Sequence, residues 1–153
     1  MSKLDVKIVE LPPMRMVSAH GFGTEPEKMA WEKLLAFALA KGLRKESELP
    51  QTFGFNNPNP SKGSPNYGYE LWIPVADDVM PEGDLRVVNF EGGLYGVTQF
   101  KDLNKIGQVW QQLVKWREGS KYKHGHHQWL EEQIVASDAF EELEFNLYLP
   151  ITE

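Results

Sequence analysis

One seven-residue pattern occurs twice in the chain and constrains the fold more than any other feature. Residues 69–75 read Tyr-Glu-Leu-Trp-Ile-Pro-Val, and residues 145–151 read Phe-Asn-Leu-Tyr-Leu-Pro-Ile. The interval between Pro74 and Pro150 nearly equals that between Trp31 and Trp110, which both stand in helix-like segments. We therefore expect two half-domains of one plan, about 5–80 and 84–153, related by a pseudo-twofold axis. A cleft at such a junction is a common place for a ligand.

The composition fits a single globular domain over residues 1–153. The chain is 41% hydrophobic and long enough to bury a core. It has no apolar run near the roughly 20 residues that span a bilayer, and its start lacks the apolar region of a signal peptide. The absence of cysteine agrees with a reducing compartment, so we expect a cytoplasmic protein. A net charge of −6 without a basic stripe argues against direct binding to nucleic acid.

The first half reads as strands around one helix. Thr24 can cap that helix, with Glu27 completing a capping box, and Gly42 suits its end after Lys41. Residues 12–13, both proline, indicate a turn between two extended segments. The expected strands are residues 6–11, 14–17, 52–55 and 67–75.

The second half repeats this order. Residues 85–90 and 94–100 flank Glu-Gly-Gly as a hairpin, and Asp102 can cap a helix that reaches Glu118. Residues 129–135 contain good helix formers, but the repeat requires a strand there. With a last strand at 145–151, the chain predicts an α+β fold of duplicated βαββ units, with antiparallel strands, two main helices and a central ligand cleft.

Strand alternation separates the core from a second face. Tyr69, Leu71 and Ile73 share one side of their strand, and Glu70 and Trp72 share the other. The C-terminal strand alternates in the same way, with apolar residues on the side expected to face the helix. The second face would carry Glu70, Trp72, Glu144 and Tyr148, and the third strand of the second half would add Trp129, Glu131 and Gln133.

Carboxylates among aromatic rings suit two kinds of chemistry. Such a site attracts an organic cation, and each ring adds roughly 0.5 to 2 kcal/mol for a desolvated cation. A carboxylate whose pKa is raised by burial can instead act as a general acid or base. The polar side of a solvated antiparallel sheet is the alternative reading. The sequence leaves these readings open.

The candidate site residues follow from these faces. For catalysis the candidates are Glu131, Glu144 and Tyr148, and no cofactor is implied. No metal site is expected, because His124, His126 and His127 stand in an expected loop without a fixed carboxylate partner. The residues expected to bind ligand are Tyr69, Glu70, Trp72, Trp110, Trp129, Glu131, Glu144 and Tyr148.

The chain resembles the GyrI-like small-molecule-binding family, the effector-binding domain of AraC-type and MerR-type multidrug regulators. The resemblance rests on residues 13–21, 69–75, 92–97 and 147–151 and on the capped helix with Trp31. It implies a channel between the halves that binds lipophilic cations over aromatic rings and a buried acid, with Glu131 as the best match. Many relatives resemble Glu-any-Tyr where this chain has Glu-Glu-Gln, so either Glu131 or Glu132 could face the channel.

These patterns lead us to expect a stand-alone domain that binds amphipathic, cationic small molecules. The regulators carry a helix-turn-helix region, whereas this chain runs directly from the first strand to the last, so we expect no DNA-binding module and no membrane contact. Two alternatives remain. The protein could hydrolyse cyclopropane-bearing or similar electrophilic alkylating compounds, as some members of the family do, or it could be an interaction module for gyrase or a separate regulator.

Overall fold

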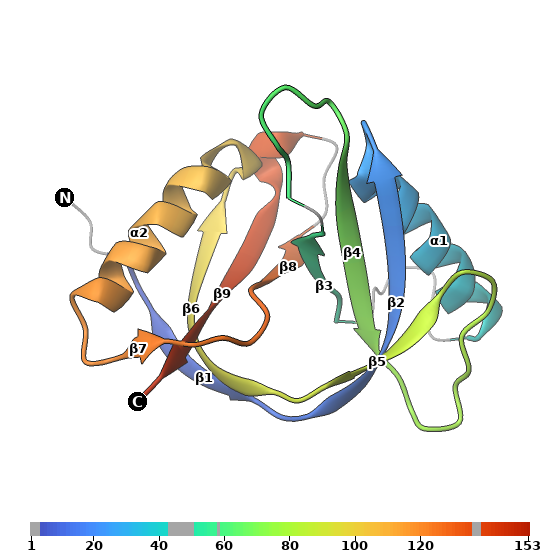
Figure 1. The fold of residues 1–153 in the computed structure, drawn as a ribbon, viewed down its shortest axis with the longest axis horizontal. Coiled ribbons are helices and arrows are strands. Elements are labelled where there is room, and N and C mark those ends of the chain that lie inside the picture. The colour runs from blue at the N-terminus through green and yellow to red at the C-terminus, as the bar shows by residue number, and fades with distance from the viewer. Residues whose placement is uncertain (1–3, 43–50, 58, 136–138) are drawn as a thin grey trace. The chain divides into compact units, whose positions relative to one another are not determined.

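The chain folds into two compact units of antiparallel strands, each with one main helix. A computed structural model describes residues 4–42, 51–57, 59–135 and 139–153. Unit 1 comprises Met1–Pro13 with Glu91–Glu153, and unit 2 comprises Met14–Phe90. The expected α+β class, with two main helices and antiparallel strands, is confirmed (Figure 1). Neither main helix has the length and apolar character needed to cross a membrane, and no other described helix does.

Unit 2 is a sheet with α1 (Pro26–Ala40) packed on one face. Its strands are β2 (Met14–Gly23), β3 (Phe53–Asn56), β4 (Tyr67–Pro74) and β5 (Arg86–Phe90). They pair in the order β3-β4-β2-β5, with every pair antiparallel. Apolar side chains of α1, β2 and β4 form the core: Ala30, Leu34, Phe37, Val17, Ala19, Tyr69, Leu71 and Ile73. The face of the sheet opposite α1 is therefore left for other side chains.

Unit 1 repeats this arrangement with α2 (Ile106–Glu118), which follows a short 3-10 turn, η1 (Leu103–Lys105). Its main strands pair antiparallel in the order β1-β6-β9-β8. Val109 and Leu113 of α2 pack on Leu147 and Leu149 of β9. The bounds are β1 (Lys7–Leu11), β6 (Gly93–Lys101), β7 (Lys123–His124), β8 (Leu130–Val135), η2 (Phe140–Glu142) and β9 (Glu144–Thr152).

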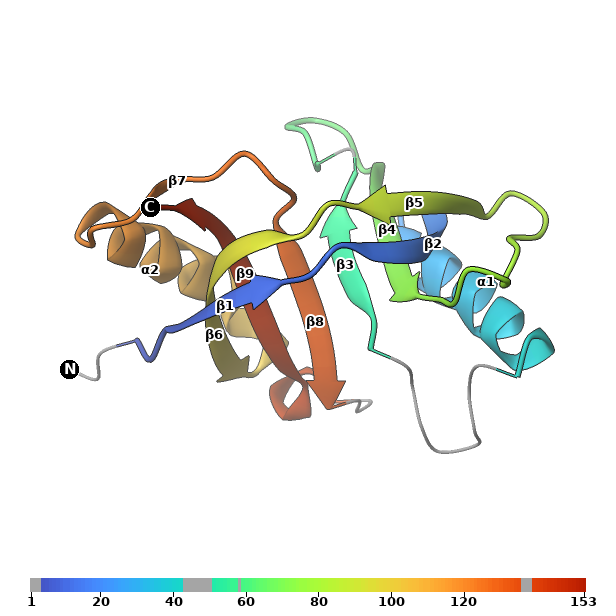
Figure 2. The same cartoon turned by 90° about the horizontal axis from the view of Figure 1, so that it is seen from below.

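The expected hairpin of residues 85–90 and 94–100 is wrong, and so is the expected turn at Pro12 and Pro13, because the strands on either side pair elsewhere. β1 pairs with β6, placing Leu11 opposite Gly93, whereas β5 pairs with β2, placing Phe90 opposite Met14. Figure 2 shows β1 beside β6 and β5 beside β2. Pro13 keeps Pro12 out of the right-handed helical region that a type I turn needs, so the chain continues extended from β1 toward β2. Each half of the sequence therefore gives one strand to the sheet of the other.

The helix starts follow the expectations only in part. The capping box is wrong: α1 starts at Pro26 without a side-chain cap, and Glu27 instead accepts a hydrogen bond from the Tyr67 hydroxyl at 2.6 Å. Burial and this carboxylate raise the pKa of Tyr67 to about 12. Asp102 caps the 3-10 turn η1, since its side chain accepts from the Asn104 backbone N–H at 3.0 Å, but α2 itself begins at Ile106 without a side-chain cap.

The expected strand at residues 129–135 is confirmed as β8. Leu130 stands opposite Tyr148 of β9, and Glu132 stands opposite Asn146. Pairing along one edge of β9 thus overrides the local helix propensity of this segment.

We predict that Gly92→Ala is much more destabilising than Gly83→Ala. Both glycines have positive φ, +81° and +62°, so alanine is strained at either position. Only at Gly92 would the new Cβ overlap the Leu11 carbonyl oxygen, while nothing lies within 4 Å at Gly83. In urea unfolding, Gly83→Ala should lose about 1 kcal/mol and Gly92→Ala at least about 2 kcal/mol more. Equal losses would show that the connection after β1 does not press on Gly92.

Candidate functional site

Unit 2 has a buried carboxylate on the sheet face opposite α1. Glu70 alternates with the core residues of β4 and is only 2% exposed. One oxygen, Oε2, accepts from Ser18 Oγ at 2.8 Å and from Trp72 Nε1 at 2.6 Å. The other, Oε1, accepts from Asn57 Nδ2 at 3.1 Å and from the Arg86 guanidinium at 3.2 Å. Four donors therefore replace the water that Glu70 loses on burial.

These donors keep Glu70 ionised. Burial alone raises the pKa of the Glu70 carboxyl, but the hydrogen bonds from Ser18, Trp72 and Asn57 and the charge of Arg86 together outweigh it. The net pKa is lower than the ordinary value of 4.5. Phe55 meets the Trp72 ring edge-on at 4.8 Å, and Phe90 lies 5.8 Å from it. The result is a negative charge beside a cluster of aromatic rings.

Unit 1 holds its own buried carboxylate, Glu132 on β8. This side chain is 9% exposed and accepts from the Tyr148 hydroxyl at 2.8 Å and from Asn146 Nδ2 at 3.1 Å. Both donors are neutral. Among the residues that the structure describes, no Lys, Arg or His forms an ion pair with Glu132. Its charge is therefore hydrogen-bonded but not balanced by a cation.

Another tyrosine ring and a small pocket lie beside Tyr148, which holds this second carboxylate. Burial, the hydrogen bond to Glu132 and its charge raise the pKa of Tyr148, so the phenol stays a donor. The buried ring of Tyr95 meets Tyr148 edge-on at 5.6 Å. A cavity of about 260 Å³ opens beside Tyr148 and Asn146, on the sheet face opposite α2. Its other lining residues come from the start of the chain and from β6: Asp5, Lys7, Val9, Val97 and Gln99.

The face expected for the third strand of the second half is wrong. Glu131 stands opposite Leu147, which packs against α2, whereas Glu132 stands opposite Asn146. Directly paired residues share a face, so Glu132 is the one on the side of Tyr148. The prediction put Leu130 on the helix side because it is apolar. Leu130 is fully buried, but on the same side as Glu132. Alternation shows which residues share a face, but it does not show which face meets the helix.

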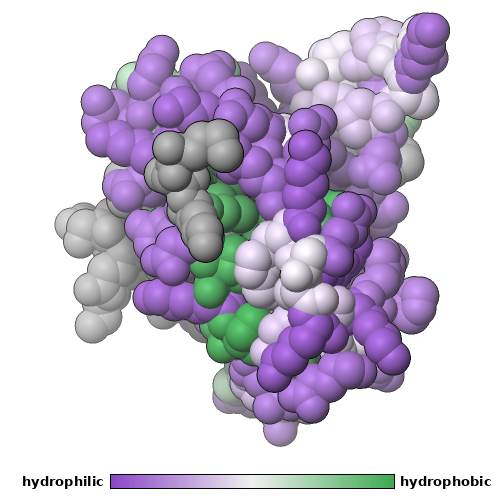
Figure 3. Space-filling view, turned by 90° about the vertical axis from the view of Figure 1, so that its left-hand side faces the viewer, coloured by the Kyte–Doolittle hydropathy of each residue, from purple (hydrophilic) through white to green (hydrophobic). Residues whose placement is uncertain are grey.

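Glu131 lies instead on the α2 side, together with two tryptophans that were expected to bind ligand, Trp110 and Trp129. Trp110 Nε1 donates to Glu131 Oε2 at 3.3 Å, and the Trp110 and Trp129 rings lie 5.2 Å apart. Trp110 also lines a shallow depression of about 360 Å³ on the outer side of α2. The surface at this end of unit 1 is mostly hydrophilic, with a small hydrophobic area near its middle (Figure 3). These three residues are thus separate from the face that carries Glu132.

The other expected residues divide between core and surface. Tyr69 is buried in the core beneath α1. Glu144 is half-buried, with Gln99 Nε2 at 3.5 Å from its carboxylate. The sequence analysis left Glu132 open as the alternative to Glu131, and it did not predict Ser18, Asn57, Arg86 or Asn146 as contacts of the acids. The alternation of β9 places Asn146 beside Tyr148, and that was a usable signal, whereas the contacts of Ser18 and Asn57 depend on pairing.

The histidine segment lies at the edge of β9. His124 and His126 are exposed, with ring centroids 5.2 Å apart, and His127 Nε2 lies 2.7 Å from the Leu94 carbonyl oxygen. In the described ranges, no three potential metal-ligating side chains come together.

Sequence comparison places the chain in a family. The profile of Cass2, the integron-associated effector binding protein, matches residues 7–151. The chain belongs to this family. The match confirms the resemblance to GyrI-like effector-binding domains, and effector binding indicates a small-molecule ligand. No protein of curated function matches this Cass2 family member.

Solved structures share the fold of this Cass2 family member. EcmrR, in a cryo-EM complex with DNA, superposes with a TM-score of 0.73 at 14% identity, over 100% of this chain and 59% of EcmrR. A hydrolase from Listeria innocua superposes with a TM-score of 0.68 at 15% identity, over 99% of this chain and 94% of the hydrolase. SAV2435 bound to tetraphenylphosphonium superposes with a TM-score of 0.60 at 12% identity, over 97% of this chain and 94% of SAV2435. At these identities the likeness concerns the fold alone.

We predict that Glu70 links the stability of the protein to pH. Its folded pKa lies below the ordinary 4.5, so its contribution is complete above that pH and is lost as pH falls through the lowered folded pKa. Glu70→Gln should lower the free energy of unfolding by about 1 to 3 kcal/mol at pH 7. Between pH 4.5 and pH 3 this variant should lose less stability than the wild type does. Urea unfolding at pH 7, 4.5 and 3 measures both effects.

Glu82→Gln is the matched control, because Glu82 pairs with Lys41 at the surface of the same unit, with its own side chain 62% exposed. An exposed pair contributes little, so this variant should follow the wild type. An unchanged pH dependence in Glu70→Gln would contradict the assignment of a buried, ionised carboxylate.

Proposed function

We propose that the protein binds amphipathic, cationic small molecules at the Glu132 face of unit 1. The observation that carries this proposal is the Glu132 carboxylate, which is 9% exposed and held by two neutral donors, Tyr148 and Asn146. A buried charge without a counterion is costly, and a ligand cation would supply the missing charge. A lipophilic cation suits this position because it loses little hydration on entry.

Aromatic rings beside Glu132 support the same class of ligand. Tyr95 and Tyr148 meet edge-on near the carboxylate, and ring faces add to the binding of a desolvated cation. SAV2435, which shares the fold, is described as bound to tetraphenylphosphonium, itself a lipophilic cation. The family description, effector binding, agrees with a role in sensing or sequestering such compounds.

We propose that both units derive from one repeated plan. Their sheets have matching orders, β3-β4-β2-β5 and β8-β9-β6-β1. When residues 69–75 are aligned with residues 145–151, Glu70 corresponds to Asn146. Phe55, which stands opposite Glu70, then corresponds to Glu132, which stands opposite Asn146. Each unit then has one buried carboxylate among the described residues, on different strands, and only the one in unit 2 is paired with an arginine. This difference supports Glu132 as the stronger attractor of a cation.

The proposal places the protein in the cytoplasm, in agreement with its lack of cysteine, and includes no direct contact with nucleic acid or membrane. No cofactor is required. The third alternative, a module for gyrase or a separate regulator, gains no support from the comparisons, and we do not propose it.

We predict that Glu132→Gln weakens the binding of tetraphenylphosphonium at least about tenfold, equivalent to about 1.4 kcal/mol, because it removes the charge at nearly constant shape. Glu131→Gln should change the affinity by less than about twofold, since Glu131 lies on the α2 side. Quenching of tryptophan fluorescence measures both affinities. The anion tetraphenylborate, of similar size and shape, should bind the wild type more weakly.

The paired variants make this test specific. A large loss in Glu131→Gln with none in Glu132→Gln would return the site to the α2 side. Equal affinity for the cation and the anion would remove the carboxylate from the proposal altogether.

A hydrolase is the second candidate, and one contact favours it. The Tyr148 hydroxyl lies 2.8 Å from Glu132, so a phenol donor and a carboxylate base stand together beside a cavity. Glu132 would take a proton from a water molecule whose oxygen bonds to a carbon of a strained cyclopropane ring, while a ring C–C bond breaks and the leaving carbon takes the proton of the Tyr148 hydroxyl. The proton on Glu132 then returns to the Tyr148 oxygen. A fold neighbour from Listeria innocua is described as a hydrolase. In this reading Glu132 takes the role first considered for Glu131 and Glu144.

We predict that the protein retains such an alkylating compound without turning it over. The experiment incubates an excess of a cyclopropane-bearing substrate with the protein and follows the ring-opened product by mass spectrometry. A binder yields no product beyond the uncatalysed rate, and Tyr148→Phe should keep tetraphenylphosphonium affinity within about threefold, because the charge on Glu132 remains. Repeated turnover that disappears in both Tyr148→Phe and Glu132→Gln would establish the hydrolase instead.

A further inference from the structure

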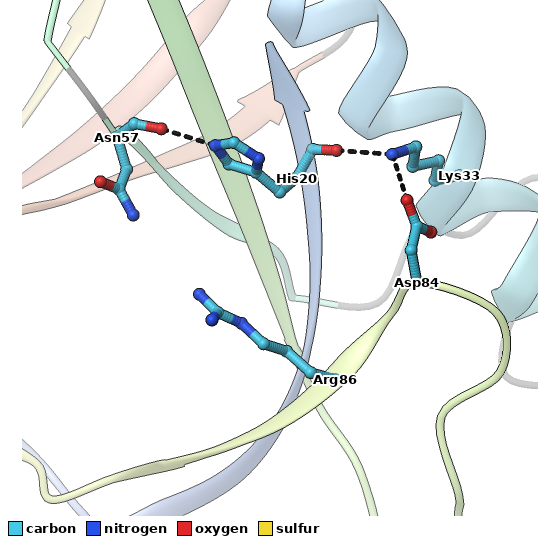
Figure 4. Close-up of a pocket in the computed structure, with 5 residues that line it drawn as sticks. All are labelled: His20, Lys33, Asn57, Asp84 and Arg86. Carbon is cyan, nitrogen blue, oxygen red and sulfur yellow. Dashed lines mark hydrogen bonds and ion pairs between the residues drawn. The ribbon is translucent and has the colours of Figure 1, made fainter.

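A second pocket lies in unit 2 and has a different chemistry from the Glu132 face. It is an open cavity of about 440 Å³, and all five residues that line it have polar or charged side chains. They come from β2, α1, the residue after β3, the segment before β5, and the first residue of β5. The lining residues are His20, Lys33, Asn57, Asp84 and Arg86 (Figure 4).

The two cationic side chains are held in place without using all their donors. Arg86 makes one contact, at 3.2 Å, with Glu70, and its side chain is 65% exposed. A guanidinium has five N–H donors, and in the described part of the chain the others have no protein partner. Lys33 Nζ donates to the His20 carbonyl oxygen at 2.8 Å and to Asp84 at 2.6 Å, which leaves one N–H.

The Glu70 carboxylate keeps hydrogen-bond donors even without Arg86. Glu70 already accepts from Ser18, Trp72 and Asn57, and all three donors are neutral. The guanidinium end of Arg86 points toward the side of the pocket where the His20 ring and Asn57 lie (Figure 4). A planar fork with free N–H groups facing an open cavity matches the geometry of a carboxylate or phosphate group.

We propose that this pocket binds a small oxyanion, a carboxylate or phosphate group, through Arg86 with support from Lys33. Asp84 pairs with Lys33 and the buried Glu70 pairs with Arg86, so what the pocket offers a ligand is the unused N–H groups of Arg86 and Lys33. His20 Nε2 lies 2.6 Å from the Asn57 carbonyl oxygen, so that nitrogen carries a proton and the ring is held at the pocket wall. The pocket is thus complementary to anions, whereas the Glu132 face is complementary to cations.

The test is a titration of the full chain with inorganic phosphate and, separately, with acetate, at ionic strength held constant with chloride. NMR signals of the His20 ring and of the Arg86 side chain report occupancy. We expect saturable shifts in the millimolar range for at least one anion, and a dissociation constant raised at least about tenfold in Arg86→Gln. Saturation by phosphate alone indicates a phosphate ligand, and saturation by acetate alone indicates a carboxylate.

Lys41→Gln is the control for loss of charge, because it removes one positive charge from unit 2 outside the pocket. Its dissociation constant should stay within about twofold of the wild type. Arg86→Lys keeps the charge but not the fork, so it should bind with intermediate affinity and serves if Arg86→Gln fails to fold. Shifts that rise linearly with both anions, or equal affinities in the Arg86 and Lys41 variants, overturn the proposal.

This inference does not rest on the proposed cation binding. Glu132→Gln should lose tetraphenylphosphonium and keep the anion, whereas Arg86→Gln should lose the anion while Glu132 still binds the cation. The two proposals can therefore fail separately.

Discussion

The alternation of side chains along β4 and β9 is the constraint on which both units depend. Every second residue of these strands packs under α1 or α2, so Glu70 and Trp72, or Asn146 and Tyr148, must occupy the opposite face. The polar groups on that face are also buried, and burial is costly unless each finds a partner. The chemistry of the candidate site follows from this requirement, because the buried carboxylates collect the hydrogen-bond donors around them.

The two carboxylates meet the requirement in different ways. Glu70 has three neutral donors and an exposed arginine, and its pKa stays below the ordinary value despite burial. Glu132 has a phenol and an amide and no described cation. The first is a stable structural charge that positions Arg86. The second keeps an uncompensated charge beside tyrosine rings, where a ligand can supply the balance.

The exchange of β1 and β5 shows how pairing departs from sequence order. β1 belongs to the sheet of unit 1, although the strands of unit 2 follow it in the chain. β5 belongs to the sheet of unit 2, although the remaining strands of unit 1 follow it. Gly92, at positive φ, lies against the Leu11 carbonyl, where no larger residue would fit. Asp5 and Lys7 thereby become part of the pocket beside Tyr148, far from it in sequence.

The sequence by itself determined the α+β class, the two helices, the strands of both halves and the alternation of β4 and β9, because periodicity and helix ends are local properties. It even required β8 to be a strand against local propensity, through the repeat. Only the tertiary structure decided the strand partners, the parity of β8 and so the choice of Glu132 over Glu131 on the Tyr148 face. Pairing and burial are set between distant segments, and one residue of register moves every side chain to the other side of a sheet.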